Sequence, residues 1–389
     1  MNDNNAFTRL IDRTHSSSTK WEKFGPDVLP LWVADMDFPV PQSIMSALQK
    51  RLDHPILGYT DRPDSLNAAF LGWLEYHFDW VVPEDWIVWI PGVVPGINLA
   101  AQTMLAGQDL VIPTPVYHPF FEVAEFARLA EKRVSCSLNH ATGLSEFDWD
   151  AMQAGINPNA RPNALQTKGM LAIANPQNPT GRCYSATELE NLADYVQRNN
   201  LLLVSDEIHA NIILDTHCRH IPIAKAFPDI APQTITLLAA TKTYNIPGLS
   251  CAAAIIPSPQ VREAFLNARK GLIPGIGPLG FVASEAAFAE RSSWLPDLLE
   301  QLRMNYGLIQ QQLGSRVSKL EATYLAWIRI DDVLEHRAAD AVEAYFADHG
   351  VGISPGEQFG DDAFIRVNFG CPQQTLEEGL RRLTAALKS

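Results

Sequence analysis

The fold of this chain can be inferred outward from one stretch, Thr234-Ile-Thr-Leu-Leu-Ala-Ala-Thr-Lys242-Thr-Tyr-Asn-Ile-Pro-Gly248-Leu249. An apolar, strand-forming run ends here in a lysine, a few polar residues and a Pro-Gly turn. A lysine that emerges from a buried strand loses hydration, which lowers the pKa of its amine and makes Schiff-base chemistry accessible. A lysine on an ordinary loop after a strand is the simpler interpretation of Lys242 from this stretch alone, so the decision depends on the rest of the chain.

Composition limits the classes of protein to consider. With 389 residues, 47% of them hydrophobic, the chain is long enough for a large domain and a smaller one. The formal net charge of −14 would repel nucleic acid and anionic membranes, so neither is an expected partner. We therefore expect a small-molecule substrate.

The termini and cysteines give no sign of export. The polar start Met1-Asn-Asp-Asn-Asn-Ala-Phe7 lacks the features of a signal peptide, and no later run is long enough to span a bilayer. The five cysteines include no Cys-x-x-Cys pair, which favours reduced thiols in a soluble, cytoplasmic protein. The cluster His217-Cys218-Arg219-His220 matches no zinc spacing, so we interpret it as a solvated loop and expect no metal.

The middle of the chain, from about Gly92 to Pro257, alternates short apolar runs with longer amphipathic ones. This pattern predicts an α/β fold with a mainly parallel sheet covered by helices on both faces. The predicted strands are Asp109–Pro113, Met170–Ala174, Leu201–Ser205, Ile235–Ala240 and Cys251–Ile256. Ser185-Ala-Thr-Glu188 is a capping box and predicts the start of a helix.

The flanking regions predict a second, smaller α+β domain. Helical patterns cover Ser43–Leu52, Leu66–Phe78, a long stretch from Pro278 toward Leu313, and Ala338–His349, while Thr323–Ile330 and Phe364–Asn368 resemble strands. We expect residues 1–50 to form an amino-terminal arm and part of the small domain, and residues 51–284 to form the large domain. Residues 285–389 would form an interdomain helix and the rest of the small domain.

Polar groups follow four of the predicted strands or apolar runs. They are Tyr117, Asn178, Asp206 and Lys242. Ligands of an open parallel sheet bind beyond the carboxyl ends of its strands, so these side chains should converge. Pyridoxal phosphate requires such a set: an aromatic face, a donor to its phenolic oxygen, a carboxylate for its ring nitrogen and a lysine for its aldehyde.

A phosphate site is predicted at the turn Gly92-Val-Val-Pro-Gly96, which precedes an expected helix over Ile97–Leu105. The start of a helix offers free amides and a favourable dipole to an anion. Each piece alone has a simpler explanation, since Asn-Pro-Gln-Asn-Pro-Thr-Gly is rich in turn formers and Asp206-Glu207 could be a solvated pair. Their joint occurrence in this order favours a pyridoxal phosphate site.

The sequence resembles the fold-type I pyridoxal phosphate enzymes of the class I/II aminotransferase family. The motifs that carry this resemblance are Asn175-Pro-Gln-Asn-Pro-Thr-Gly181, Ser205-Asp-Glu-Ile208 and Thr241-Lys-Thr243. Within the family it is most similar to the MalY/PatB-type cystathionine β-lyases, on motifs that cover almost the whole chain. These are Leu29-Pro-Leu-Trp-Val-Ala-Asp-Met-Asp-Phe38, His54-Pro-Ile-Leu-Gly-Tyr-Thr60, Pro91-Gly-Val-Val-Pro95, Pro115-Val-Tyr-His-Pro-Phe120 and Ser205-Asp-Glu-Ile-His209.

The resemblance implies a role for each residue at the strand ends. Lys242 would bond covalently to the cofactor and move the Cα proton of the substrate. Asp206 would pair with the pyridine nitrogen, Asn178 would donate to the phenolic oxygen, and Tyr117 would stack on the ring. Arg366 would bind the α-carboxylate of an amino acid, a task suited to its bidentate fork.

The resemblance also implies how the phosphate is held. The amides of Val93 and Val94 and the hydroxyl of Thr241 would bind it, and Tyr59 would reach the phosphate of a neighbouring subunit. The protein would therefore be a homodimer with its sites at the interface.

Three positions depart from the usual aminotransferase pattern. His209 stands where a tyrosine donor is usual, so the phenolic oxygen would lack that donor or receive it from imidazole. Ala239 replaces a serine three residues before the lysine. Ser250 stands where related aminotransferases often have a phosphate-binding arginine, which predicts weaker cofactor retention.

The resemblance implies β-elimination from L-cystathionine or a related cysteine S-conjugate, giving a thiol, pyruvate and ammonia. The alternative is transfer of the amino group to a 2-oxo acid, which would use the same residues. A regulatory or binding protein that keeps the fold and cofactor is a third hypothesis. The presence of Lys242, Asp206 and Arg366 together argues against a role without catalysis.

Overall fold

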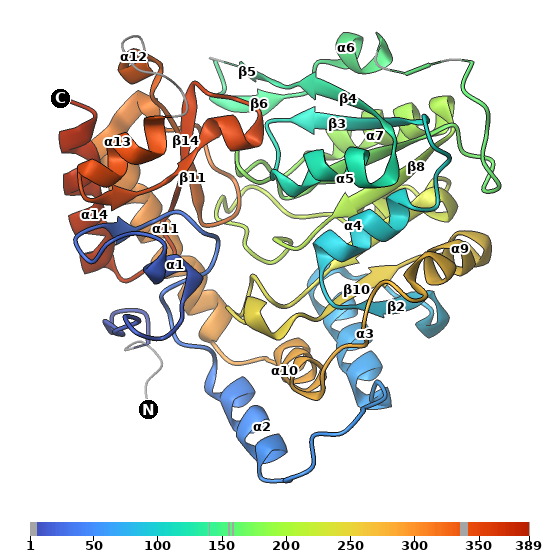
Figure 1. Cartoon of the computed structure of the whole chain (residues 1–389), viewed down its shortest axis with the longest axis horizontal. Helices are drawn as coiled ribbons and strands as arrows, with labels where there is room; N and C mark the ends of the chain where they lie inside the picture. Colours follow the sequence, from blue (N-terminus) through green and yellow to red (C-terminus); the bar gives the residue numbers. More distant parts are fainter. Residues whose placement is uncertain (1–5, 140, 155, 158, 335–340, 389) are drawn as a thin grey trace.

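The computed structural model describes residues 6–139, 141–154, 156–157, 159–334 and 341–388. A large layered unit contains the main sheet, and a smaller unit gathers the carboxyl-terminal helices and strands beside the amino-terminal arm (Figure 1). Within the described residues, we find no helix long and apolar enough to cross a membrane.

The main sheet has seven strands in the order β2-β10-β9-β8-β7-β3-β4. They are β2 (Ile87–Ile90), β3 (Asp109–Thr114), β4 (Ala130–Ser135), β7 (Gly169–Ala174), β8 (Leu201–Asp206), β9 (Thr234–Leu238) and β10 (Ala252–Ile255). Strands β4, β3, β7, β8 and β9 pair in parallel, whereas β10 is antiparallel to both β9 and β2. The predicted α/β fold with a mainly parallel sheet is confirmed.

The predicted strands differ from the observed ones in detail. All five are present, but β9 ends at Leu238 instead of Ala240, and β2 and β4 were not predicted. The apolar run of β10 predicts burial but not direction, because direction depends on the path of the connecting chain. Residues Ala239 and Ala240 lie beyond the strand, at the edge where Lys242 emerges.

Helices cover both faces of this sheet, as its sequence pattern requires. Alternate residues of β8 face opposite sides: Leu202 and Val204 pack with α4 (Val93–Ala101), α5 (Pro119–Ala127) and α9 (Pro259–Arg269). Leu201 and Leu203 pack with α6 (Trp149–Ala154) and α7 (Ala186–Asn199). This period of two is the geometry of a strand buried on both faces.

The start of α7 confirms the predicted capping box. The Glu188 amide donates to the Ser185 hydroxyl at 3.3 Å, and the Ser185 amide donates to the Glu188 carboxylate at 2.9 Å. By contrast, the helix predicted over Ile97–Leu105 begins earlier, at Val93, and ends at Ala101. Pro95 is tolerated because it lies in the first turn.

Gly96 allows α4 to lie close to the sheet. A Cβ atom at this position would come within 2.6 Å of Ile90 and 2.9 Å of Leu237. The close packing fixes the amino-terminal end of α4 over the carboxyl edge of the sheet, where the polar groups gather.

The smaller unit is built around the sheet β11-β14-β13. Its elements are α11 (Trp294–Leu313), β11 (Leu325–Arg329), α12 (Asp331–Leu334), α13 (Val342–Asp348), β12 (Val351–Gly352), β13 (Ser354–Pro355), β14 (Phe364–Asn368) and α14 (Gln373–Ala386). The helical stretch predicted from Pro278 is two helices, α10 (Pro278–Phe288) and α11, separated by a turn at Glu290. Of the predicted helix Ala338–His349, residues 338–340 lie outside the described residues.

The amino-terminal arm joins both units. It contains α1 (Thr19–Glu22) and β1 (Leu29–Pro30), and β1 pairs in parallel with β12. The chain then enters α2 (Gln42–Leu52) and α3 (Asp64–Phe78), which pack against α10. The division into domains at residues 50 and 284 stays a prediction.

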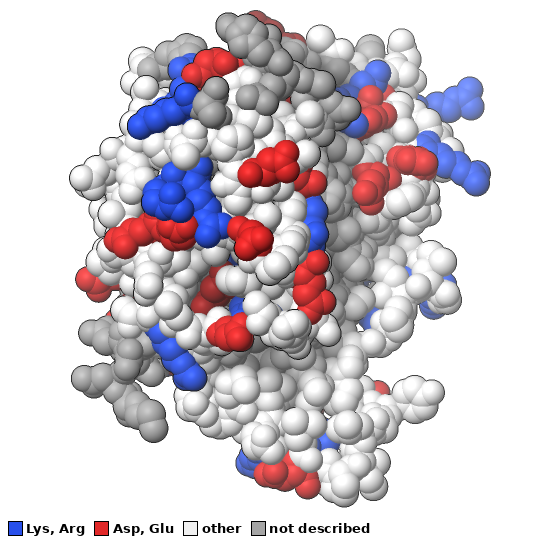
Figure 2. Space-filling view, turned by 60° about the vertical axis from the view of Figure 1, so that its left-hand side comes forward, with Lys and Arg blue, Asp and Glu red and all other residues white. Residues whose placement is uncertain are grey.

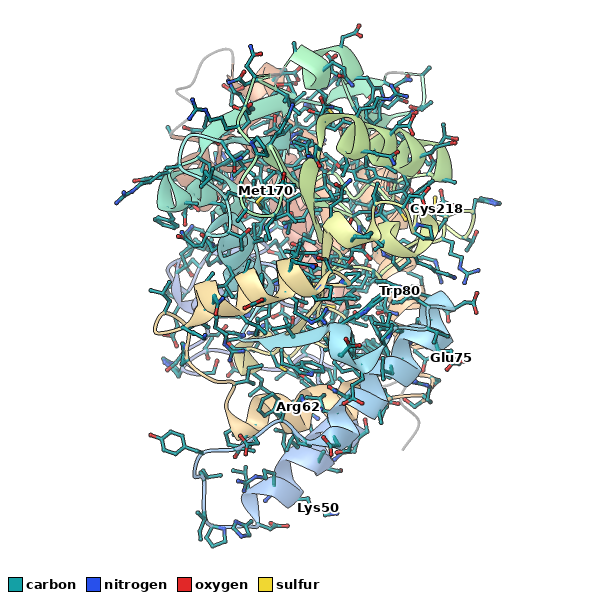
Figure 3. All side chains as sticks on the ribbon, turned by 90° about the vertical axis from the view of Figure 1, so that its right-hand side faces the viewer. Lys50, Arg62, Glu75, Trp80, Met170 and Cys218 are labelled. Atoms are coloured by element: carbon teal, nitrogen blue, oxygen red, sulfur yellow. The ribbon has the colours of Figure 1, made fainter. Side chains whose placement is uncertain are left out.

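The remaining elements lie at the periphery. The strands β5 (Ser137–Asn139) and β6 (Leu144–Glu146) form a hairpin, and α8 (Ile223–Ala226) precedes β9. Figure 2 shows acidic and basic side chains interspersed over one face of the molecule. Figure 3 shows Lys50 and Glu75 on the lower helices α2 and α3, and Met170 inside the layers around the main sheet.

Candidate active site

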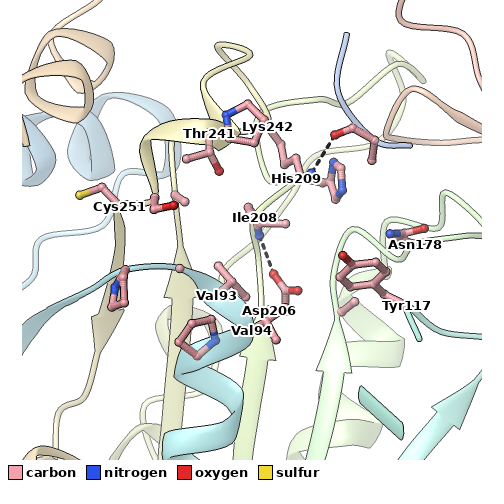
Figure 4. A pocket seen from close by; sticks show the side chains of 18 of the residues that line it. Val93, Val94, Tyr117, Asn178, Asp206, Ile208, His209, Thr241, Lys242 and Cys251 are labelled. Carbon is pink, nitrogen blue, oxygen red and sulfur yellow. Dashed lines mark hydrogen bonds between the residues drawn. The ribbon is translucent and has the colours of Figure 1, made fainter. Parts of the chain in front are cut away.

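A pocket lies at the carboxyl edge of the main sheet (Figure 4). It is lined by eight of the predicted site residues: Val93, Val94, Tyr117, Asn178, Asp206, His209, Thr241 and Lys242. They converge because β3, β7, β8 and β9 run in parallel and end at the same edge. The start of α4 adds the amides of the first helical turn.

Lys242 stands four residues beyond the end of β9. Its amine donates a hydrogen bond to the backbone carbonyl of Ala34 at 2.7 Å. Burial of the amine lowers its pKa to about 8, Arg366 adds to this effect, and Asp35 and Asp206 oppose it. The direction agrees with the expectation from the sequence, and the neutral amine is accessible near neutral pH.

Asp206 is the last residue of β8. Its carboxylate accepts a hydrogen bond from the Ile208 amide at 3.0 Å, and it forms no ion pair with any residue that the structure describes. Burial raises the pKa of the carboxyl to about 7. A buried carboxyl without a charged partner is well suited to a protonated ring nitrogen.

The start of α4 forms one end of the pocket. Gly92 precedes the helix and provides no side-chain cap, so the first amides of this nine-residue helix remain available. Thr241 and Ser250 also line the pocket. These neutral donors and the helix dipole suit a phosphate. Ser250 stands at the position where related aminotransferases often have a phosphate-binding arginine.

Arg366 lies on β14 and is buried. Its guanidinium donates to Asn178 Oδ1 at 2.9 Å and to the Trp32 carbonyl at 2.8 Å, and it lies 4.6 Å from the centroid of the Phe359 ring. Burial lowers its pKa to about 10. Arg366 does not line the pocket itself but is joined to it through Asn178.

The surroundings of Arg366 leave it ready for an anion. Its Nε atom is buried without a hydrogen-bond partner, and no carboxylate among the described residues pairs with it. A buried cation without a charged partner is stabilised when a carboxylate reaches it.

His209 is buried beside the ring of Tyr324, with 5.8 Å between the ring centroids. Its Nδ1 atom has no hydrogen-bond partner. Burial, together with the positive charges of Lys242 and Arg366, lowers the imidazole pKa to about 3. His209 therefore faces the site as a neutral imidazole, which can donate from only one nitrogen.

Tyr59 does not line this pocket. It lies between α2 and α3 and is fully exposed, at 112% of the reference area. An exposed side chain is what a contact with a partner subunit requires, so its role at a neighbouring phosphate stays a prediction.

Several residues at the site were not predicted. Ala34 contributes its carbonyl, Ile208 contributes an apolar side chain, and Tyr324 donates its hydroxyl to Ala34 at 2.9 Å. Ala34 and Ile208 had a signal in the sequence, because they belong to the motifs Leu29–Phe38 and Ser205–His209. The contacts of Tyr324 depend on the tertiary path of the chain.

The prediction that His217–His220 form a solvated loop is wrong for His220. His220 is buried, with Nε2 2.8 Å from the carboxylate of Glu207. Glu207 is itself fully buried, so the interpretation of Asp206-Glu207 as a solvated pair is excluded. No group of three metal-ligating side chains occurs in the part of the chain that the structure describes.

These residues fit pyridoxal phosphate on four structural observations. A lysine amine of lowered pKa and an unpaired buried carboxyl face the same pocket, whose end is an uncapped helix start. A buried arginine lies next to it with an unpartnered Nε. A mainly parallel sheet that carries this set at its carboxyl edge defines a fold-type I pyridoxal-phosphate-dependent enzyme.

Comparison with known proteins gives the family. The protein-family model for Aminotransferase class I and II matches residues 26–383, so the chain belongs to this family. Cystathionine beta-lyase PatB of Bacillus subtilis (strain 168) is 32% identical over 397 residues, which cover 98% of this chain and 99% of that protein.

Two solved structures resemble this one over nearly the whole chain. OvoB superposes with a TM-score of 0.91 at 37% identity, covering 98% of this chain and 99% of that one. Cystalysin from Treponema denticola, whose crystal structure contains pyridoxal 5'-phosphate, has a TM-score of 0.89 at 28% identity and covers 98% of both chains. The resemblance inferred from the motifs is confirmed.

Proposed function

We propose that this protein is a pyridoxal-phosphate-dependent carbon-sulfur β-lyase that acts on L-cystathionine or a related cysteine S-conjugate. One observation carries the proposal: the amine of Lys242 and the carboxyl of Asp206 line one pocket, the guanidinium of Arg366 is joined to that pocket through Asn178, and each of the three lacks an ion-pair partner among the described residues. The similarity to PatB over almost the full length supports the choice of a lyase.

The cofactor would be held by residues from several strand ends. Lys242 would bond to its aldehyde, Asp206 would pair with its ring nitrogen, and Tyr117 would lie against its ring. Val93 and Val94 would bind the phosphate through their amides, together with the hydroxyl of Thr241. When bound, pyridoxal phosphate supplies an electron sink that stabilises negative charge on the substrate Cα.

The side chains of this chain would then act in sequence. Arg366 binds the α-carboxylate and fixes the Cα–H bond toward Lys242. The neutral amine of Lys242 takes the proton, so the Cα–H bond breaks, an N–H bond forms and the electron pair stays with the substrate. The electron pair on Cα would then form a Cα=Cβ double bond as the Cβ–S bond breaks, and the thiolate would leave with the electrons of the Cβ–S bond. Hydrolysis of the remaining fragment gives pyruvate and ammonia.

Asn178 has two tasks in this arrangement. Its Oδ1 atom accepts from Arg366, which leaves its amide Nδ2 free to donate toward the phenolic oxygen of the cofactor. His209, neutral at physiological pH, would add a second donor at the position where relatives use tyrosine. We also propose a cytoplasmic homodimer, to which exposed Tyr59 would contribute.

Transamination is the second candidate, because the matching family model is that of aminotransferases. Both reactions use Lys242 as the base, and they differ in whether a β-substituent leaves before the proton returns. A binding protein without catalysis would not need an amine of lowered pKa beside an unpaired arginine.

The test is to incubate the purified protein with L-cystathionine, with and without a 2-oxo acid. We expect equal amounts of pyruvate and free thiol in the absence of the 2-oxo acid. Amino-group transfer without thiol release would overturn the lyase proposal in favour of an aminotransferase. Neither product, despite a bound cofactor, would favour another substrate class or the binding protein.

A further inference from the structure

Two carbonyl groups of the arm segment Trp32–Met36, those of Trp32 and Ala34, accept hydrogen bonds from residues of the site. The Trp32 carbonyl accepts from Arg366 at 2.8 Å. The Ala34 carbonyl accepts from Lys242 at 2.7 Å and from the Tyr324 hydroxyl at 2.9 Å. Both cations of the site therefore donate to the same short segment, which comes from the opposite end of the chain.

Two asparagine side chains hold this segment from its two sides. Asn245 comes three residues after Lys242; its amide nitrogen donates to the Met36 carbonyl at 2.9 Å and its oxygen accepts from the Met36 amide at 2.9 Å. Asn368 comes two residues after Arg366; its amide nitrogen donates to the Asp35 carbonyl at 2.7 Å and to the Val33 carbonyl at 2.5 Å. Asn368 is fully buried.

These contacts leave the Ala34 carbonyl little freedom to turn. The peptide groups on both sides of it are hydrogen-bonded to Asn245 or Asn368, so rotation would break buried bonds. Its two lone pairs serve two donors, Lys242 and Tyr324. When the lysine leaves to bond elsewhere, Tyr324 still satisfies the carbonyl, so the departure does not leave a buried acceptor without a partner.

We propose that the Ala34 carbonyl is the resting acceptor for the Lys242 amine whenever that amine is not bonded to the cofactor, and that Asn245 and Asn368 are positioning residues that hold it in place. The proposal rests on the proposed function and deepens it. Once Lys242 has taken the proton from the substrate, its ammonium group would donate a hydrogen bond to this carbonyl. A neutral acceptor stabilises the ammonium through a hydrogen bond without a fixed charge beside it.

The test measures the ionisation of Lys242 directly. The full-length chain is freed of cofactor, checked for recovery of its absorbance when pyridoxal phosphate is returned, and labelled with a trace of acetic anhydride between pH 6 and 10. Mass spectrometry of the peptide that contains Lys242 gives the apparent pKa. The charged groups near the amine, Arg366, Asp35 and Asp206, are unchanged in every variant.

Each variant removes one of the two asparagine side chains that hold the segment Trp32–Met36, and we call these two the clamp variants. Asn368→Ala removes the contacts to Val33 and Asp35 and the bond that Asn368 Oδ1 accepts from the Gly370 amide. Asn245→Gly removes the contacts to Met36 and to the Phe38 carbonyl, and keeps the left-handed backbone at this position, where φ is 57°. The control is Asn305→Ala, because Asn305 is also fully buried and its amide donates to two carbonyls, those of Phe369 at 2.9 Å and Cys371 at 2.8 Å.

We expect both clamp variants to lower the apparent pKa of Lys242 by about one unit, because the ammonium loses a hydrogen bond that stabilises it. Labelling at pH 6.5 would then be roughly tenfold faster than in the wild type. The Asn305→Ala control should match the wild type.

Two results would overturn the proposal. One is an unchanged rate in both clamp variants, and the other is an equal increase in the control. If Asn368→Ala does not fold, Asn245→Gly alone decides between these outcomes. The labelling uses no substrate, so its result is independent of whether the protein proves to be a lyase or an aminotransferase.

Discussion

Two groups of buried or half-buried residues in this molecule each contain a lysine, an aspartate and an arginine, but differ in how completely these charges are paired. In the arm, Asp37 contacts Lys20 at 2.7 Å, Arg13 at 2.7 Å and the indole nitrogen of Trp21 at 3.0 Å. In the pocket region, Lys242, Asp206 and Arg366 form no ion pairs with one another or with other described residues. We call the first group the arm cluster and the second the site cluster.

The two aspartates show the difference most clearly. Burial alone would raise the pKa of Asp37, but Lys20, Trp21 and Arg13 together hold it below the usual value. Burial raises the pKa of Asp206 to about 7, because its Ile208 contact and the distant Lys242 do not compensate. Complete pairing makes the arm cluster structural, whereas incomplete pairing leaves the site cluster able to bind charged ligands.

The largest expected effect comes from removing the lysine of the site cluster. Lys242→Ala removes both the covalent attachment and the base, so we expect thiol release from L-cystathionine to fall by at least about 10⁴-fold. The unfolding midpoint of the cofactor-free chain should stay close to that of the wild type. Residual activity within tenfold of the wild type would show that another residue is the base.

The corresponding change in the arm cluster should act on stability. Lys20→Ala leaves Asp37 buried with one cation fewer, and we expect the free energy of unfolding in urea to fall by about 3–5 kcal/mol. The control is Lys23→Ala, which removes the more exposed contact with Glu343 and should cost less than about 1 kcal/mol. Equal losses in the two variants would contradict the structural role of the arm cluster.

A conservative change of the arginine should separate binding from catalysis. Arg366→Lys keeps the charge but loses the bidentate fork, so we expect KM for the amino-acid substrate to rise about 10- to 100-fold. The effect on kcat should be smaller. An unchanged KM in steady-state assays would mean that the α-carboxylate binds elsewhere.

The smallest effect is a change in how stability depends on pH. Because the folded-state pKa of Asp206 is raised to about 7, the folded chain keeps a proton that the unfolded chain releases near pH 4. The stability of the cofactor-free chain should therefore fall as pH rises from about 4 to 7. Asp206→Asn should remove this part of the loss. The melting temperature of the variant minus that of the wild type should therefore be a few degrees higher at pH 8 than at pH 5.

The same experiment on the arm cluster should give the opposite sign. The folded-state pKa of Asp37 is lowered, so its contribution to stability is present at neutral pH and is lost as pH falls below the usual range of an aspartate. Asp37→Asn should reduce the melting temperature at pH 7 more than at pH 3. Parallel pH profiles for the two asparagine variants would refute the distinction between the clusters.

Much of the fold and site was predictable from local patterns. The parallel strands follow from apolar runs buried on both faces, α7 from its capping box, and the convergence of Tyr117, Asn178, Asp206 and Lys242 from the rule for strand ends. The beginning of the helix was predicted at Ile97, whereas α4 begins at Val93; Pro95 is compatible with the observed helix because it lies in the first turn.

The rest depends on tertiary contacts that leave little trace in the sequence. The acceptor for Lys242 is a backbone carbonyl more than 200 residues away, and any residue type could supply it. His220 is buried against the carboxylate of Glu207, and a local polar pattern cannot reveal this contact. The arm cluster was also not predicted, because its members are separated by apolar and turn residues in the sequence.

The most direct test of the account is to find which lysine carries the cofactor. The purified protein is loaded with pyridoxal phosphate, reduced with borohydride, digested and mapped by mass spectrometry. We predict one phosphopyridoxyl group per chain, on Lys242, and none on Lys20, whose amine is held by Asp37. Attachment to a different lysine, or a chain that retains no label after reduction, would contradict the assignment of the site cluster.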